Sequence, residues 1–322
     1  MKALQIVAPR KVETVDVPVP QIADDEVLVE VKCCVTCPHW DISLYTGKDI
    51  FERPGHPIYP LPYGYIGHEM AGRVVETGPA VETLKEGDRV ASLVSAGSDY
   101  QPGFYCEYIN RPEDTVVRIP DEVSDETAAN MEMCYRMVPY IRLLGLDNIL
   151  GKRVGVTGMG PAGLIAIQMV KAIGAAETVA IDILPERLEL ARKLGATHAL
   201  NSDTDEIQKL KDGPLQAAVD CSGVAAGLQV ALDHVQRGAV SIFSVPHGET
   251  AFTTRHMGNN LLSGLKEGPT IEDARFTIAL WQRKQLDTEA LVSAKLPLER
   301  YAEGVEMLID RKAIKVAFYP GR

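Results

Sequence analysis

The glycine-rich run GMGPAG at residues 158–163 constrains the fold of this chain more than any other stretch. It follows a short apolar segment, residues 153–157, and precedes a nearly continuous apolar run, residues 164–173. We expect a buried strand before it and a buried helix after it. A G-x-G-x-x-G pattern in that context is typical of a dinucleotide-binding site. Its glycines permit a tight turn, close approach of a pyrophosphate to the backbone and close helix–strand packing, and the helix N-terminus offers unpaired N–H groups to the phosphates.

The segment after this fingerprint predicts which dinucleotide binds. Residues 178–182 have the pattern of a second strand that ends at Asp182, 19 residues beyond Gly163 (182 − 163). An acidic side chain at about this distance accepts hydrogen bonds from the adenosine ribose, and its charge repels a 2′-phosphate. We therefore expect NAD rather than NADP. Residues 185–194 then predict a helix, with Pro185 at its start and Gly195 just past its end.

Two later strands should complete the cofactor site. Residues 217–223 and 239–245 are expected to hold parallel strands that end at Ser222 and Ser244, and ligands of such sheets lie beyond the carboxyl ends of the strands. The alternative for this region is a doubly wound sheet that binds no nucleotide. The residues that we expect to contact the cofactor are Gly158, Gly160, Pro161, Ala162, Gly163, Asp182, Arg187, Ser222, Ser244 and Val245.

The length of 322 residues suits two domains, and the pattern changes along the chain. Before residue 120, short strand-like runs are cut by proline and glycine turns, which predicts a mostly antiparallel β domain. Residues 135–265 alternate strand and helix and predict an α/β Rossmann domain with a doubly wound parallel sheet. Helices at 271–284 and 301–310 and a closing strand at 314–318 should return to the first domain. We therefore expect a catalytic domain of residues 1–134 and 266–322 around a dinucleotide-binding domain of residues 135–265.

Charge and composition exclude several classes of partner. The net charge of −11 gives no field that attracts nucleic acid or an anionic membrane. The N-terminus has no signal-peptide pattern, and no apolar run approaches the length of a membrane span. Six cysteines in a chain of this length do not form a disulfide framework, so we expect a reducing, cytoplasmic compartment.

Three segments outside the glycine fingerprint carry side chains that can bind a metal. Thiolate, imidazole and carboxylate from separate points of a fold are what a catalytic zinc needs, with one position left open. None of the spacings is a diagnostic short motif. Taken alone, each cysteine has the pattern of a small buried apolar residue, and each histidine that of a structural one. The candidates are Cys33, Cys34, Cys37 and His39, then His68 and Glu69, then Glu132 and Cys134.

Over nearly its whole length the chain resembles the zinc-dependent medium-chain alcohol and polyol dehydrogenases, in particular their sorbitol and threonine dehydrogenase branch. The resemblance implies a GroES-like β domain beside the Rossmann domain, one catalytic zinc, NAD, and an alcohol or polyol substrate that is oxidised to a ketone or aldehyde. We also expect a homo-dimer or homo-tetramer. The residues that carry the resemblance are 27–32 with Cys37, Gly67-His-Glu69 with Gly72, 87–90, 104–109, 158–163, 188–196 and 314–316.

The family's zinc ligands map onto particular residues of this chain. Its cysteine ligand falls on Cys37 and its histidine ligand on His68. Glu69 matches a glutamate that in the polyol and threonine branches binds zinc directly or through water. Glu132 matches a further glutamate near the metal. Cys134 lies one residue past the cysteine position of the alcohol dehydrogenases, so we rank it below Glu132 as third ligand.

Two departures from the family pattern affect the expected chemistry. The segment Cys37-Pro-His-Trp-Asp41 has one residue more than usual and lacks the hydroxyl residue of the usual proton relay. We expect Asp41 to orient His68, and His39, or Glu69 through a water, to carry the proton away. Between Ser92 and Arg111 the only cysteine is Cys106, so we expect no structural zinc.

Two other functions stay open from the residues. One is a zinc-free member of the superfamily that reduces an enone or quinone, in which Cys37, His68 and Glu69 would have no purpose. The other is a non-catalytic nucleotide-binding or structural protein that kept the fold. The substrate cannot be derived from the sequence, and the expected pocket walls are Trp40, Tyr45, Phe51 and Tyr59.

Overall fold

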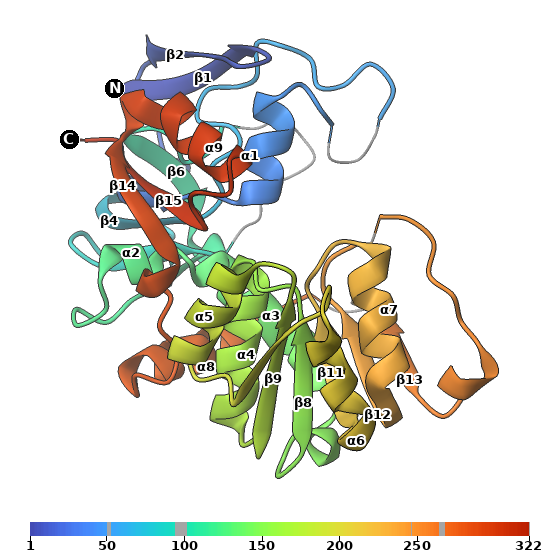
Figure 1. Cartoon of the computed structure of the whole chain (residues 1–322). Coiled ribbons are helices and arrows are strands. Elements are labelled where there is room, and N and C mark those ends of the chain that lie inside the picture. The colour runs from blue at the N-terminus through green and yellow to red at the C-terminus, as the bar shows by residue number, and fades with distance from the viewer. Residues whose placement is uncertain (50–52, 94–101, 246, 264–267, 322) are drawn as a thin grey trace. The chain divides into compact units, whose positions relative to one another are not determined.

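The computed structural model describes residues 1–49, 53–93, 102–245, 247–263 and 268–321. Two compact units emerge from the contacts: Met1–Met133 together with Thr288–Arg322, and Cys134–Asp287 (Figure 1). No helix in the described ranges is both long enough and apolar enough to cross a membrane.

The first unit is built around a mostly antiparallel sheet, as expected. In its described part, seven strands form that sheet, in which β14-β15-β3-β4-β5-β7 lie side by side and β6 also pairs with β3, while β1 and β2 form a hairpin. Seven of the ten residues of strand β3 are apolar and buried, whereas Glu26, Glu30 and Lys32 are half-buried. The strands are β1 (Lys2–Ala8), β2 (Lys11–Asp16), β3 (Glu26–Val35), β4 (Met70–Thr77), β5 (Arg89–Ser92), β6 (Tyr108–Pro112), β7 (Val116–Arg118), β14 (Val292–Pro297) and β15 (Lys315–Tyr319).

Short helices flank this sheet. Helix α1 begins directly after Cys37, which occupies its N-cap position, and Pro38 suits the first turn because its ring fixes a helical φ. The hydroxyl of Ser124 caps α2 by accepting the N–H of Thr127 (3.2 Å), the capping that its sequence predicts. The helices are α1 (Pro38–Tyr45), α2 (Asp125–Ala128) and α9 (Tyr301–Ile309), with 3-10 turns at Glu113–Thr115, Glu289–Leu291 and Leu298–Arg300.

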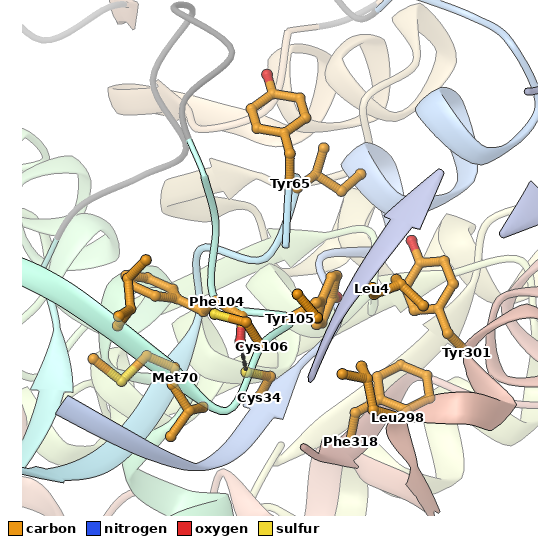
Figure 2. Close-up of a cluster of buried hydrophobic side chains, with 14 of the residues drawn as sticks. Leu4, Cys34, Tyr65, Met70, Phe104, Tyr105, Cys106, Leu298, Tyr301 and Phe318 are labelled. Atoms are coloured by element: carbon orange, nitrogen blue, oxygen red, sulfur yellow. Dashed lines mark hydrogen bonds between the residues drawn. The ribbon is translucent and has the colours of Figure 1, made fainter. Parts of the chain in front are cut away.

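The hydrophobic core of the first unit joins the two ends of the chain. Leu4 from β1 and Met70 from β4 belong to the same buried cluster as Leu298, Tyr301 and Phe318 of the C-terminal segment (Figure 2). Strand β15 pairs antiparallel with β3 and parallel with β14. The closing strand therefore returns to the first unit, as its sequence position suggested.

The second unit is a doubly wound α/β unit. Six strands of its described part form a parallel sheet in the order β10-β9-β8-β11-β12-β13, the order of a Rossmann fold. Helices α4, α5 and α7 pack on its strands. The strands are β8 (Arg153–Thr157), β9 (Glu177–Asp182), β10 (His198–Asn201), β11 (Leu215–Asp220), β12 (Val235–Ile242) and β13 (Asn260–Ser263); the helices are α3 (Met131–Leu143), α4 (Pro161–Ile173), α5 (Pro185–Lys193), α6 (Lys209–Asp212), α7 (Ala225–His234) and α8 (Ile271–Gln282).

The contacts divide the chain before Thr288, whereas the sequence suggested a return to the first domain at residue 266. Helix α8 stays with the second unit, because Arg142 of α3 donates two hydrogen bonds to the buried Asp273 (3.0 and 3.2 Å). The side chain of Gln168 in α4 also exchanges hydrogen bonds with the backbone of Asp287 (2.7 and 3.2 Å). The returning segment begins at Thr288, and β14 is its first strand.

Candidate active site

Strands β3 and β4 bring the first group of candidate residues together. Cys37 follows the end of β3, and His68 and Glu69 precede β4, which pairs antiparallel with β3. The backbone N–H of Val35 donates to the carbonyl of Glu69 (3.1 Å), which closes this junction. One ligand atom each of Cys37, His68 and Glu69 lies within 4.8 Å of the other two. His68 and Glu69 are buried and Cys37 is half-buried.

The ring of His68 is oriented so that one nitrogen is left for a ligand. Its Nδ1 lies 2.8 Å from the carbonyl oxygen of Ile66, so Nδ1 carries the proton and donates it there. Nε2 is then the unprotonated nitrogen of the neutral ring, the form that binds a metal. It lies 4.0 Å from Oε1 of Glu69. A backbone carbonyl thus holds the ring, where the sequence suggested Asp41.

Asp41 instead holds the backbone of Cys37. Its Oδ2 accepts the N–H of Cys37 (2.8 Å), and its Oδ1 accepts the hydroxyls of Tyr105 (2.8 Å) and Tyr301 (2.7 Å). Burial raises the pKa of Asp41, and the two tyrosine hydrogen bonds partly offset this rise because they stabilise the ionised carboxylate. The prediction that Asp41 orients His68 is therefore wrong, since Nδ1 of His68 donates to the carbonyl of Ile66 instead.

Glu69 shares its buried site with a lysine that the sequence analysis did not single out. Lys315 of β15 donates from Nζ to Oε2 of Glu69, and both side chains are 0% exposed. Oε1 of Glu69 has no hydrogen-bond partner among the described residues. Burial raises the pKa of Glu69 to about 6, although the charges of Lys315 and His68 lower it. A lysine inside the apolar run 314–318 could have been noticed, because a fully buried lysine requires a partner.

The donor set fits a zinc ion. Burial lowers the pKa of His68, but a hydrogen bond to Cys37 and the charges of Cys37, Glu132 and Glu69 raise it to about 10. An imidazole surrounded by anionic donors, and a buried carboxylate oxygen without a partner, are features that a bound cation would satisfy. Glu132 and Cys134 are both buried in α3 and lie outside the three-residue group, but the charge of Glu132 raises the pKa of His68 and of Glu69.

The glycine fingerprint of the second unit has the geometry that a pyrophosphate needs. Gly158 has a φ of +82°, and a Cβ there would lie 2.5 Å from the Cα of Ser222. A Cβ on Gly163 would lie 1.8 Å from the carbonyl oxygen of Gly158. At Gly160, by contrast, no atom of the described residues lies within 4 Å of an added Cβ. Helix α4 starts at Pro161, with Ala162 in its first turn and no capping side chain in the described part, so its N-terminus can receive an anion.

Asp182 lies at the end of β9, against the fingerprint loop. Its Oδ2 accepts the N–H of Met159 (2.5 Å) and its Oδ1 accepts the N–H of Leu184 (2.9 Å). Each carboxylate oxygen has capacity for a further hydrogen bond, so the ribose contact stays a prediction. Arg187 follows in the first turn of α5 and is half-buried.

The expected contacts beyond β11 and β12 lie at the same edge of the sheet. These strands end at Asp220 and Ile242, two residues before the predicted ends Ser222 and Ser244. Ser222 donates its hydroxyl to the buried Asp220 (2.7 Å), and Val245 is 79% exposed. Asp220 was not singled out from the sequence, although it also accepts the hydroxyl of Thr157 (2.7 Å) and so joins β11 to β8 beneath the loop.

Comparison with known proteins identifies one family domain in each of the two units. Residues 23–121 match the alcohol dehydrogenase GroES-like domain, and residues 161–266 match the zinc-binding dehydrogenase domain. Sorbitol dehydrogenase of Bacillus subtilis is 30% identical in an alignment that covers 100% of this chain and 98% of that protein. The chain belongs to the zinc-binding medium-chain alcohol dehydrogenase family.

Other members show how this dehydrogenase relates to its family. L-threonine 3-dehydrogenase of Chelativorans sp. is 29% identical over 93% of each chain. Among solved structures, the alcohol dehydrogenase of Thermus sp. ATN1 has a TM-score of 0.86 at 25% identity over 99% of each chain. The 2R,3R-butanediol dehydrogenase of Bacillus subtilis has a TM-score of 0.84 at 26% identity over 99% of each chain. The protein is a zinc-dependent dehydrogenase with a GroES-like and a Rossmann-like part.

The remaining candidates of this dehydrogenase, the proposed relay and the expected pocket walls, lie on α1 and in the segment that follows it. His39 is exposed on α1, whereas the ring of Trp40 meets His68 edge-on, with centroids 5.6 Å apart. Tyr45 is buried in the core against Tyr301, so it is not a pocket wall. Tyr59 is half-buried and donates to the carbonyl of Leu44. Phe51 lies outside the described residues, and Trp40 is the predicted wall that reaches a metal-binding residue.

Proposed function

We propose that this dehydrogenase oxidises a secondary alcohol or polyol with NAD, using one zinc ion held by Cys37, His68 and Glu69. The observation that carries the proposal is the group of one sulfur, one imidazole and one carboxylate whose ligand atoms lie within 4.8 Å of one another. The substrate class is supported by the relatives, which include a sorbitol and a butanediol dehydrogenase. When bound, zinc supplies a Lewis acid that lowers the pKa of a hydroxyl, and NAD supplies the hydride acceptor.

The residues of the chain would divide the remaining tasks. Ile66 keeps the proton of His68 on Nδ1, which leaves Nε2 for the metal. Lys315 neutralises one oxygen of Glu69, while Oε1 is available to the metal or to a proton. Glu132 adds a second carboxylate nearby, and it is our second choice, ahead of Cys134, as a ligand.

A panel of polyols and secondary alcohols assayed with NAD tests this proposal. We expect at least one to be oxidised by the zinc-loaded protein, and chelation of zinc to abolish the reaction. Reduction of an enone or quinone by metal-depleted protein would favour a zinc-free reductase instead. Absence of any turnover, with the cofactor bound, would favour a non-catalytic nucleotide-binding protein.

The cofactor preference should follow the charge of Asp182. We expect NADH to bind more tightly than NADPH, and Asp182→Asn to bring the two affinities closer by about tenfold. Two unit charges at contact distance interact by about 1 kcal/mol in water and by about 4 kcal/mol near a protein surface, and about 1.4 kcal/mol is tenfold in affinity. Nicotinamide fluorescence titration measures both affinities. The assignment fails if NADPH binds the parent protein as tightly as NADH.

We propose His39 as the group that passes the substrate proton to solvent. Its exposed position on α1, two residues after Cys37, suits a relay, and an imidazole exchanges protons near neutral pH. Because general-base assistance is typically worth about 10²–10⁴-fold, His39→Ala should slow alcohol oxidation at least tenfold near pH 7, with less effect at high pH. Zinc content should be unchanged.

The matched control for this variant is His198→Ala, which removes an exposed histidine of β10. It should leave the pH–rate profile unaltered. A wild-type profile in the His39→Ala protein would instead assign the proton to Glu69 acting through a water.

The remaining parts of the proposal concern assembly and environment. We keep one zinc per chain, without a structural zinc, and metal analysis of purified protein counts it. None of the six cysteines, each in a described segment, forms a disulfide bond. A reducing, cytoplasmic location stays our expectation. A homo-dimer or homo-tetramer stays our expectation, to be measured by light scattering.

A further inference from the structure

Three fully buried polar side chains meet beneath Cys37. Asp41, Tyr105 and Tyr301 are each at most 1% exposed, and both tyrosine hydroxyls donate to Oδ1 of Asp41. The donors come from distant parts of the chain, since Tyr105 precedes β6 and Tyr301 opens α9. None of the three belongs to the group that would hold the metal.

Asp41 forms hydrogen bonds with both backbone polar groups of Cys37. The N–H of Asp41 donates to the carbonyl of Cys37 (2.9 Å), and Oδ2 of Asp41 accepts the N–H of Cys37 (2.8 Å). The first is the opening i→i−4 bond of α1, and the second runs from the N-cap N–H to a carboxylate of the first turn, as the second bond of a capping box does. Because Cys37 occupies the N-cap position of α1, the direction of its Sγ depends on these two bonds.

The tyrosines in turn fix the carboxylate. Their rings meet edge-on with centroids 5.1 Å apart, and Phe318 packs against Tyr105 at 5.9 Å and against Tyr301 at 5.4 Å. Rings packed at this density keep fixed orientations on the time-average. Asp41 therefore has one arrangement in which all three of its donors are satisfied, and the core sets that arrangement.

We propose that Asp41, Tyr105 and Tyr301 form a positioning network that fixes Cys37, so that zinc affinity depends on two tyrosine hydroxyls that do not touch the metal. The inference rests on the zinc centre of the proposed function. The inference also explains what the extra residue between Cys37 and Asp41 does. With Asp41 four residues after Cys37, its carboxylate accepts the N–H of that cysteine, which precedes the helix. Partners behind a metal ligand typically contribute about 10–100-fold in affinity or activity.

The test compares Tyr301→Phe and Tyr105→Phe with a matched control, Tyr319→Phe. Tyr319 is also buried in the first unit, and its hydroxyl donates to Glu126 (2.5 Å), which is not part of the network. Affinities for Zn²⁺ and Co²⁺ are measured by competition with a chelator at a temperature where every variant is folded. We expect each network variant to bind about tenfold more weakly, and Tyr319→Phe to bind within twofold of the parent.

Two further readouts separate positioning from a general loss of stability. The thiolate-to-cobalt charge-transfer band should weaken or shift in Tyr301→Phe and Tyr105→Phe but not in Tyr319→Phe. Deuterium exchange at the amide of Cys37 in the metal-free protein should be faster in the network variants alone.

Unchanged affinity and band in both network variants, or an equal loss in Tyr319→Phe, would overturn the inference while the zinc centre stands. A parent protein without any thiolate-to-cobalt band would instead contradict the zinc centre, and the inference would fall with it.

Discussion

Replacing Cys37 or His68 by alanine should remove the bound zinc and abolish alcohol oxidation while the protein stays folded. Each residue supplies one of three donors in a small buried group, and the loss of one donor leaves too few to hold the ion. The hydrophobic core of the first unit surrounds the site without depending on the metal, since it joins β1, β3, β4, α9 and β15. Zinc content by elemental analysis, turnover with NAD and a thermal unfolding curve measure the three effects.

The controls for this prediction also identify the third ligand. Cys106→Ala removes a buried thiol outside the metal group and should keep its zinc. Among Glu69→Gln, Glu132→Gln and Cys134→Ala, the substitution that causes the largest loss of zinc identifies the third ligand. We expect this to be Glu69→Gln. Unfolding of the metal-free parent at room temperature would contradict the prediction, because zinc would then be structural.

Lys315→Met should destabilise the metal-free protein by about 3–5 kcal/mol, the usual cost of removing one partner of a buried ion pair. Lys315 and Glu69 are fully buried, so the carboxylate would be left without its cation in the protein interior. The double variant Lys315→Met/Glu69→Gln should recover most of this loss, because it removes both charges. Urea unfolding in the presence of a chelator gives the free energy of unfolding of the parent, of the Lys315→Met and Glu69→Gln proteins and of the double variant, which together form a double-mutant cycle.

Zinc should change the outcome of that experiment. A bound cation close to Glu69 replaces part of the charge of Lys315, so the Lys315→Met protein should gain more stability from zinc than the parent. Lys312→Met, which breaks an exposed pair with Asp310, is the control and should leave the unfolding curve unaltered. If the Lys315→Met protein were as stable as the parent without metal, Glu69 would be neutral in the metal-free protein.

The fold of the second unit was largely predictable because its evidence is local. Strand β8, helix α4, strand β9 and helix α5 surround the fingerprint, and their apolar runs, prolines and glycines lie within a few residues of the observed ends. Strand β14 was not predicted, because its side chains are mixed and it is held by pairing with β15, the strand that closes the chain. The division before Thr288 was missed for a similar reason, since a side chain in α3 holds α8.

The candidate site was predictable in its donors and not in its supports. Cys37, His68 and Glu69 were assigned through the resemblance to a family, since none of their spacings is diagnostic, and β3 and β4 bring them together. The partners behind them lie far away along the chain: Lys315 is 246 residues from Glu69, and Tyr301 is 260 residues from Asp41. The expected bond from Asp41 to His68 was wrong because a backbone carbonyl, which a sequence pattern does not display, takes that position.

The return of residues 288–322 to the first unit sets an order for synthesis on the ribosome. The metal-binding side chains emerge early, but their supports, Tyr301 and Lys315, emerge only after the whole of Cys134–Asp287 has been made. Thr36, beside Cys37, likewise exchanges hydrogen bonds with the backbone of Val316 (2.9 and 3.0 Å). Since domains generally fold as units during translation, the second unit can be complete while the first still waits for its last strands. A nascent chain would therefore expose Cys37 and an open sheet edge at β3 for the time that about half of the protein takes to be made.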